Sequence, residues 1–315
     1  MLNFWHTTRC TFNFILADKL RGPEADGLRM VRLQDLRKEK PDWIVSRTIT
    51  LKGALRGEFT DECLALSYRW ASPEDPDPDG WQLDELRKHL REKPAVKYVF
   101  VDFMCAPQEV RSPKDKIEFA TILPNMFLLY LGCSVLVVMF DDTYMQRFWP
   151  QLEAWQSCMQ GSALGLRATP KDQLRCTVVC VQKAPAMFQD DLFDRWLSRN
   201  VAEASERLGK DYIQVFKKSD KELQLQKLDH LDYLVRRAYS DEAEATPRAP
   251  EQQPAGAQGG SGSSGGLLSK VERIKEALGI TAKLPKDVIA EANEQLGLEP
   301  KGGLLAQAEA VLEAL

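Results

Sequence analysis

Four apolar runs, separated by segments with helical periodicity, restrict the folds open to this chain more than any other feature. The runs cover residues 62–70 (ECLALSYRW), 96–105 (VKYVFVDFMC), 134–140 (SVLVVMF) and 175–181 (RCTVVCV). They are too continuous for strands with one exposed face, and they are typical of parallel strands covered on both faces. Because strand and helix alternate, the sequence predicts an α/β fold with a doubly wound parallel sheet.

The segments around these runs predict further elements. Residues 82–93 place Leu83, Leu86 and Leu90 on one face of a helix. Further helices are expected over residues 115–132, with Pro124 as a kink or break, and over 148–160, 186–209 and 220–239. Strand patterns are expected within residues 28–53, at an edge of the sheet, and over residues 211–219.

A change in composition divides the chain near residue 244. Residues 244–266 contain Pro, Gly, Gln and Ser but no large apolar residue, which is typical of a flexible linker. We therefore expect an N-terminal extension packed on the surface over residues 1–27, an α/β domain over 28–240, a flexible linker over 241–266 and three short helices over 267–315. This helical module is small enough to need a partner, so its expected role is docking or tethering.

Composition excludes several classes of protein. Of 315 residues, 44% are hydrophobic and 28% charged, which suits a globular chain, and the net charge of −4 comes without a basic stripe for nucleic acid. The longest apolar stretch, residues 126–140, is interrupted by Gly132 and Cys133 and is too short to span a membrane. We expect neither a nucleic-acid partner nor a membrane anchor.

The cysteines and histidines bear on compartment and cofactors. Seven cysteines without closely spaced pairs indicate reduced thiols and a cytoplasmic protein. None of the three histidines lies near a cysteine pair, so we expect no metal site. The chain has no glycine-rich dinucleotide fingerprint, which argues against an oxidoreductase with a bound nicotinamide cofactor.

Polar and aromatic residues gather where the predicted strands end. Ser67, Tyr68, Arg69 and Trp70 end the first run, and Asp102 interrupts the second. After the third run, Trp149 and Glu153 are four residues apart and share one face of the predicted helix. Ligands of such sheets bind beyond the carboxyl ends of the strands, so we expect these residues to line one crevice.

Three of these segments resemble the successive boxes of the heterokaryon incompatibility (HET) domain family, which is related to Toll/interleukin-1 receptor (TIR) domains. They are ALSYRW (65–70), VFVDFMCAPQ (99–108) and RFWPQLEAW (147–155), and the resemblance covers approximately residues 28–185. Arg69 stands where HET proteins often have cysteine and brings the first box closer to TIR domains. The resemblance implies a TIR/flavodoxin-like sheet and a role in signalling or immunity.

In TIR enzymes that cleave NAD, a glutamate four residues after a tryptophan is the catalytic carboxylate. The resemblance therefore implies that Glu153 is catalytic, with NAD as substrate rather than cofactor. Such a carboxylate stabilises the positive charge that the ribose acquires when the nicotinamide bond breaks. Around it, Arg69 suits a pyrophosphate, Tyr68 or Trp70 suits stacking on a ring, and Ser67 suits a phosphate or ribose.

Each of these residues also has a structural role open to it. Asp102 suits a helix cap, Trp149 and Trp155 suit the core, and Glu153 suits an ion pair with Arg147 or Arg69. A nucleophilic Cys105 is disfavoured because no histidine is placed near it to activate it. Two classes thus stay open: an NAD glycohydrolase switched on by self-association, and a non-catalytic scaffold of the same fold whose C-terminal helices recruit a protein partner.

Overall fold

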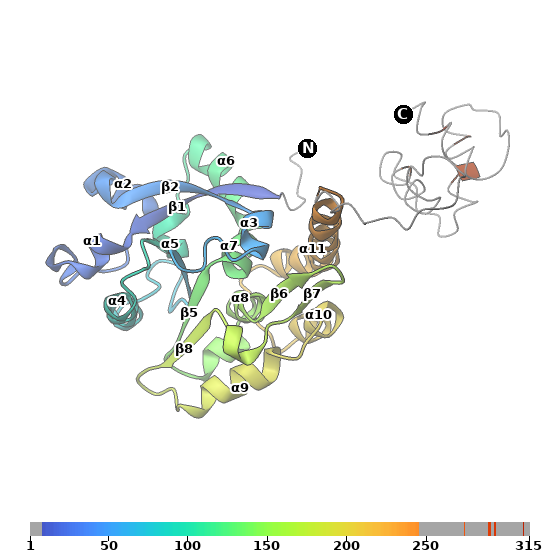
Figure 1. Cartoon of the computed structure of the whole chain (residues 1–315). Helices are drawn as coiled ribbons and strands as arrows, with labels where there is room; N and C mark the ends of the chain where they lie inside the picture. The colour runs from blue at the N-terminus through green and yellow to red at the C-terminus, as the bar shows by residue number, and fades with distance from the viewer. Residues whose placement is uncertain (1–7, 246–273, 275–288, 291–292, 294–310, 312–315) are drawn as a thin grey trace, which may run out of the picture. The chain divides into compact units, whose positions relative to one another are not determined.

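A six-stranded sheet, in the order β2-β1-β4-β3-β5-β8, organises the computed structural model of the chain (Figure 1). The structure describes residues 8–245 and, beyond them, residues 274, 289–290, 293 and 311. The strands are β1 Arg9–Leu16, β2 Ile44–Thr50, β3 Cys63–Tyr68, β4 Tyr98–Phe100, β5 Ser134–Met139 and β8 Cys176–Cys180. The pairs within β4-β3-β5-β8 are parallel, and both pairs made by β1 are antiparallel.

The four predicted apolar runs form the four parallel strands, which confirms the prediction of an α/β fold with a mostly parallel sheet. All six residues of β3 are buried, as are five of the six residues of β5. The chain leaves β3 for β4 on one side and then returns to β5 on the other side. Consecutive connections therefore diverge at β3 and β5, and the carboxyl ends of these strands lie side by side.

Helices cover both faces of the parallel strands. Helices α4 (Trp81–Glu92) and α8 (Phe148–Ser157) each contact β5, and Figure 1 shows them on opposite sides of it. Helix α7 (Phe127–Gly132) packs beside α8. The three leucines predicted to face the core from α4 are fully buried, as the helical spacing predicts.

Local signals in the sequence explain where the helices begin and end. The carboxylate of Asp77 accepts hydrogen bonds from the first-turn amides of Gln82 and Leu83, at 3.2 and 2.9 Å, which fixes the start of α4. Helix α6 (Pro113–Ile122) begins with a capping box made by Ser112 and Asp115. A 3-10 turn that contains Pro124 (η3, Leu123–Asn125) separates α6 from α7, so the predicted break is present.

The other elements lie around this sheet. They are α1 Ala17–Arg21, η1 Pro23–Ala25, α2 Leu33–Glu39, η2 Pro41–Trp43, α3 Leu51–Leu55, α5 Asp102–Cys105, η4 Asp142–Gln146, β6 Met159–Ser162, β7 Gly165–Ala168, η5 Lys171–Gln173, α9 Met187–Trp196, α10 Val201–Gly209 and α11 Lys218–Ala245. Strands β6 and β7 form a separate antiparallel pair. The contacts of α11 with α10, β6 and β7 join it to the same unit.

The prediction of a surface extension over residues 1–27 is wrong for the part that the structure describes. Strand β1 lies between β2 and β4, and the side chains of Phe12, Phe14 and Ile15 are fully buried. The ring of Phe12 packs edge-on against Phe100, with 5.9 Å between ring centroids. These residues therefore form part of the main core.

Two of the weaker strand predictions also need correction. Within residues 28–53, Ile44–Thr50 is a strand at the sheet edge, but Leu33–Glu39 is helix α2. Residues 211–219 form no strand: Gln214 makes an isolated bridge to Arg147, and helix α11 begins at Lys218. The apolar residues of this segment lie in the connection between α10 and α11. Their alternation with polar residues is the same as in a strand, so the sequence pattern alone does not distinguish the two.

The C-terminal predictions lie mostly outside the described residues. Helix α11 extends to Ala245, so the first five residues of the linker predicted over 241–266 are helical. The chain divides into two units, residues 1–247 and 248–315. Within the module predicted over 267–315, residues 274, 289–290, 293 and 311 are helical, and the remainder lies outside the described residues.

Replacement of Phe12 by alanine tests whether β1 is part of the core. We expect Phe12→Ala to lower the free energy of unfolding by about 3–5 kcal/mol, because a fully buried ring is lost. The exposed neighbour Thr11 is the control, and Thr11→Ala should cost about 1 kcal/mol or less. Urea denaturation measures both values, and equal small losses would mean that this segment is a dispensable extension.

Candidate functional site

Glu153 of helix α8 meets the carboxyl end of strand β3 inside the protein. Its Oε2 lies 2.6 Å from the hydroxyl oxygen of Ser67, and the residue is only 6% exposed. Tyr144, from the turn η4 that follows β5, places its hydroxyl 2.8 Å from the same serine oxygen and 3.1 Å from the carbonyl oxygen of Pro150. The three side chains form one buried polar network where β3 and β5 diverge.

The surroundings of Glu153 favour its neutral form. Burial raises the pKa of this carboxyl well above its ordinary value, and the nearby negative charge of Asp102 raises it further. Hydrogen bonds from Ser67 and from Tyr130 of helix α7 act in the opposite direction but are weaker. Glu153 forms no ion pair with any lysine or arginine among the described residues, so the predicted pairing with Arg147 or Arg69 is absent there.

The hydroxyl groups hold the network together. The Ser67 hydroxyl donates to Oε2 of Glu153, and the Tyr144 hydroxyl donates to the carbonyl oxygen of Pro150. The Ser67 and Tyr144 oxygens also lie within hydrogen-bond distance of each other, and either can be the donor. Tyr144 thus helps to position the serine that contacts Glu153.

A second carboxyl, that of Asp102, lies at the start of helix α5. It accepts hydrogen bonds from the Tyr68 hydroxyl at 2.8 Å, from the Trp70 indole nitrogen at 3.0 Å and from the backbone amide of Phe103 at 2.7 Å. Burial raises the pKa of Asp102 to about 6 even though all three donors favour the charged form. Asp102 therefore has the role at a helix start that the sequence analysis left open, and it also contacts two residues of the first box.

Arg69 links the ends of β3 and β5. Its guanidinium lies 4.5 Å from the centroid of the Phe140 ring, and its Nη2 lies 3.5 Å from the carboxylate of Asp141. Its Nη1 donates to the carbonyl of Trp70 at 2.9 Å, whereas its buried Nε has no hydrogen-bond partner in the described part of the chain. Arg69 thus lies at the same edge of the sheet as Glu153.

The tryptophans and Cys105 have different environments. Trp149 is half-buried and packs against Phe148, with 5.6 Å between ring centroids. Its described contact is thus with the neighbouring ring and not with the network around Glu153. Trp155 is fully buried and donates to the carbonyl of Arg199 at 3.0 Å, which is the predicted core role. Burial raises the pKa of the Cys105 thiol to about 12, which makes it a poor nucleophile.

Two residues of the network, Tyr130 and Tyr144, do not follow from the sequence analysis. Tyr130 lies within the apolar stretch 126–140, where an aromatic residue reads as core, and its hydroxyl donates to the carbonyl of Leu66 at 3.3 Å. Tyr144 stands in a polar turn that carries no distinctive motif. The one available signal is that each is a tyrosine close in sequence to the third run, Tyr130 before its start and Tyr144 after its end.

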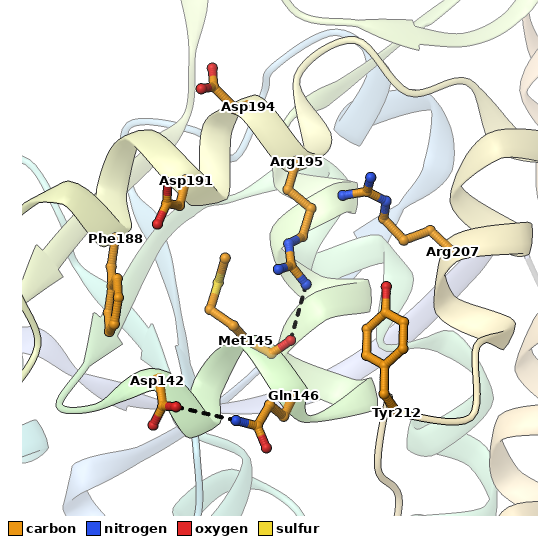
Figure 2. A pocket seen from close by; sticks show the side chains of 9 residues that line it. All are labelled: Asp142, Met145, Gln146, Phe188, Asp191, Asp194, Arg195, Arg207 and Tyr212. Atoms are coloured by element: carbon orange, nitrogen blue, oxygen red, sulfur yellow. Dashed lines mark hydrogen bonds between the residues drawn. The ribbon is translucent and has the colours of Figure 1, made fainter.

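The network is closed to solvent. Ser67, Tyr144 and Glu153 are only 0%, 1% and 6% exposed. The hollows on the described part of the molecule include two of about 480 and 620 Å³, and neither of these is lined by Glu153 or Asp102. The smaller hollow lies next to the turn η4 and helices α9 and α10 (Figure 2). A ligand thus reaches Glu153 only if side chains at the ends of β3 and β5 move.

Comparison of the chain with family models, with curated proteins and with solved structures finds no match in any of the three. Among the helices that the structure describes, none has the length and apolar character needed to cross a bilayer. The described residues also contain no group of three His, Cys, Asp or Glu side chains arranged to hold a metal ion.

The raised pKa of Asp102 predicts how stability depends on pH. The unfolded chain has a pKa of about 3.9 at this residue, and the folded chain about 6, so folding favours the protonated form. This contribution is complete below about pH 4 and is lost as the pH rises through about 6, for a total of about 3 kcal/mol. Asp102→Asn should remove this part of the pH dependence.

Urea denaturation of wild-type and Asp102→Asn protein across this pH range measures the difference. The variant with the exposed Asp79 replaced by asparagine is the matched control and should follow the wild type. Parallel stability curves for wild type and Asp102→Asn would show that Asp102 has an ordinary pKa in the folded protein.

Proposed function

We propose that the chain is a HET/TIR-like hydrolase that cleaves the nicotinamide glycosidic bond of NAD, with Glu153 as the catalytic carboxylate. The observation that carries the proposal is the buried network in which Glu153 contacts Ser67 without any cation partner among the described residues. The network joins a residue of the first box to a residue of the third. The second box contributes Asp102, which contacts Tyr68 and Trp70.

The arrangement of the strands supports a TIR/flavodoxin-like sheet. Counted along the chain, the four parallel strands lie in the order second, first, third, fourth. In doubly wound sheets with this order, ligands bind where the first and third strands diverge, beyond their carboxyl ends. In this chain these strands are β3 and β5, where Ser67, Arg69 and Asp141 lie.

The energetics of burial favour a functional role for the two carboxyls. A carboxyl removed from water without a cation is unfavourable for stability, and a glutamine would serve a purely structural hydrogen bond without this cost. Two neighbouring carboxyls with raised pKa values are instead typical of acid–base sites. The pKa of Asp102 is about 6, and that of Glu153 is raised well above its ordinary value, so the two carboxyls suit distinct roles.

The charge of the substrate fits this difference. The nicotinamide ring of NAD is positively charged, so its binding beside Glu153 lowers the pKa of the glutamate and favours the carboxylate. As the bond between nicotinamide and ribose breaks, its electrons leave with nicotinamide, and the carboxylate stabilises the positive ribose. Water then adds to the ribose carbon and transfers a proton to a carboxylate, which leaves ADP-ribose.

The remaining site residues divide into two groups. Arg69 and Trp70 are half-buried, and they are the groups proposed to contact the pyrophosphate and a ring of the substrate. Ser67 and Tyr68 are buried and instead hold Glu153 and Asp102 in place. Access requires that the contact between Arg69 and Asp141 opens, and we propose that self-association of the chain in the cytosol drives this step.

A second candidate function is a non-catalytic scaffold of the same fold. It is favoured by the closure of the network, since Glu153 is only 6% exposed and its hydrogen bonds are satisfied within the protein. In this case the network stabilises the join between β3 and α8, and the C-terminal helices recruit a protein partner. The two candidates differ in whether the carboxyl end of β3 ever opens to NAD.

Nicotinamide release from NAD, measured with purified protein at high concentration, tests the proposal. The wild type should release nicotinamide, and Glu153→Gln should reduce the rate by about a hundredfold or more because the amide cannot stabilise the ribose cation. Glutamine retains the size and hydrogen-bonding capacity of the side chain, so the fold should be preserved.

The matched control is Glu92→Gln, at the exposed end of α4, which should leave the rate unchanged. Equal rates for wild type and Glu153→Gln would exclude Glu153 as the catalytic residue. A wild type that self-associates by light scattering but releases no nicotinamide would favour the scaffold.

A further inference from the structure

The hollow of about 480 Å³ beside the turn η4 has two chemically different ends. Figure 2 shows Arg195, Arg207 and Tyr212 together on one side of Met145, and Phe188 and Asp142 on the other. These residues come from η4, α9, α10 and the segment that follows α10. A volume of this size lies within the range of small-molecule binding sites.

Two guanidinium groups lie at the first end. Helix α9 carries Arg195 and helix α10 carries Arg207, and Figure 2 shows the two side chains next to each other. Burial is the largest cause that lowers the pKa of Arg195, and the charge of Arg207 lowers it further, whereas Tyr212 and Asp191 act in the opposite direction. An anion bound to both guanidinium groups relieves the repulsion between them.

Much of the hydrogen-bonding capacity of this pair is unused. The guanidinium of Arg207 has no hydrogen bond or ion pair with any residue in the described part of the chain. Arg195 uses one nitrogen, Nη1, to donate to the carbonyl of Met145 at 3.2 Å and to Gln151 at 3.4 Å. Tyr212 adds a phenol hydroxyl that is likewise without a partner there, in a residue that is 58% exposed.

The other end presents a ring and hydrogen-bond acceptors. Phe188 is half-buried, so one part of its ring packs on the core while the rest lines the hollow. The exposed carboxylates of Asp142 and Asp191 lie near it in Figure 2, and Asp142 accepts a hydrogen bond from Gln146 at 3.3 Å. A third carboxylate, that of Asp194, points away from the two arginines in the same view.

We propose that this hollow binds a nucleoside monophosphate, with Arg195, Arg207 and Tyr212 on the phosphate and Phe188 against the base. Planar guanidinium groups donate paired hydrogen bonds to phosphate oxygens, which suits the first end. The carboxylates of Asp142 and Asp191 accept hydrogen bonds from ribose hydroxyls at the second end. An inorganic anion alone would leave the second end unused, and a cation would meet the two arginines.

This inference is independent of the proposed hydrolysis. Glu153 and Asp102 do not line the hollow, so a ligand there does not contact the proposed catalytic carboxyl. The turn η4 connects the two places, since Tyr144 contacts Ser67 and the neighbouring Met145 accepts from Arg195. Binding in the hollow is therefore measurable in the Glu153→Gln variant, whether or not the chain cleaves NAD.

Isothermal titration calorimetry of the full chain with AMP tests the proposal. We expect one AMP per chain, with adenosine binding at least about tenfold more weakly because it lacks the charge-assisted hydrogen bonds of the phosphate. Inorganic phosphate should also bind more weakly than AMP, because it does not contact Phe188. Added salt should weaken the binding of AMP and of phosphate.

Arg207→Met is the decisive variant, because Arg207 has no described partner whose loss would disturb the fold. It should weaken AMP binding by about tenfold or more. Arg91→Met, at an exposed position on α4, makes the same change in net charge and should leave AMP binding unchanged.

Phe188→Ala tests the other end of the hollow, and it should weaken the binding of AMP but not the binding of inorganic phosphate. Absence of AMP binding, or equal binding by the Arg207→Met and Arg91→Met variants, would overturn the proposal.

Discussion

The contact between Ser67 and Glu153 is the interaction on which the account of this protein depends. It joins the carboxyl end of a fully buried strand to the helix that covers the neighbouring strand. A carboxyl at such a position is tolerated only when its hydrogen bonds are satisfied, and the hydroxyls of Ser67 and Tyr130 serve this purpose. These groups come together because β3 and β5 are adjacent in the sheet while the connections that follow them lead in different directions. The topology of the sheet therefore determines which side chains form the site.

The two carboxyls differ because their partners differ. Asp102 accepts from three donors, which keeps its pKa at about 6 despite burial. Glu153 has fewer donors and experiences the negative charge of Asp102, so its pKa rises further. A change of charge at one carboxyl consequently alters the other. In the proposed reaction, a cationic substrate beside these carboxyls favours the ionised form of Glu153.

The sequence predicts the parallel strands and the residues at their ends because both depend on local patterns. Continuous apolar runs identify β3, β4, β5 and β8, and helical spacing identifies α4. Strand β1 is not predicted from the sequence, because the polar residues Arg9 and Asn13 interrupt its apolar pattern. Its aromatic residues, Phe12 and Phe14, are nevertheless buried in the core. Tyr144 and the pair Arg195 and Arg207 also do not follow, since nothing local indicates which distant side chains a turn or helix will meet. Long-range packing decides these positions.

The protonation state of Glu153 in the folded protein tests the central claim most directly. Carbon-13 NMR of the full chain, labelled at the glutamate side-chain carboxyls, follows this group as the pH is raised, and Glu153→Gln assigns its signal. The account predicts that the Glu153 carboxyl ionises only well above the ordinary glutamate range. A Glu153 signal that titrates with the exposed glutamates would contradict it, because the network would then hold an ordinary carboxylate.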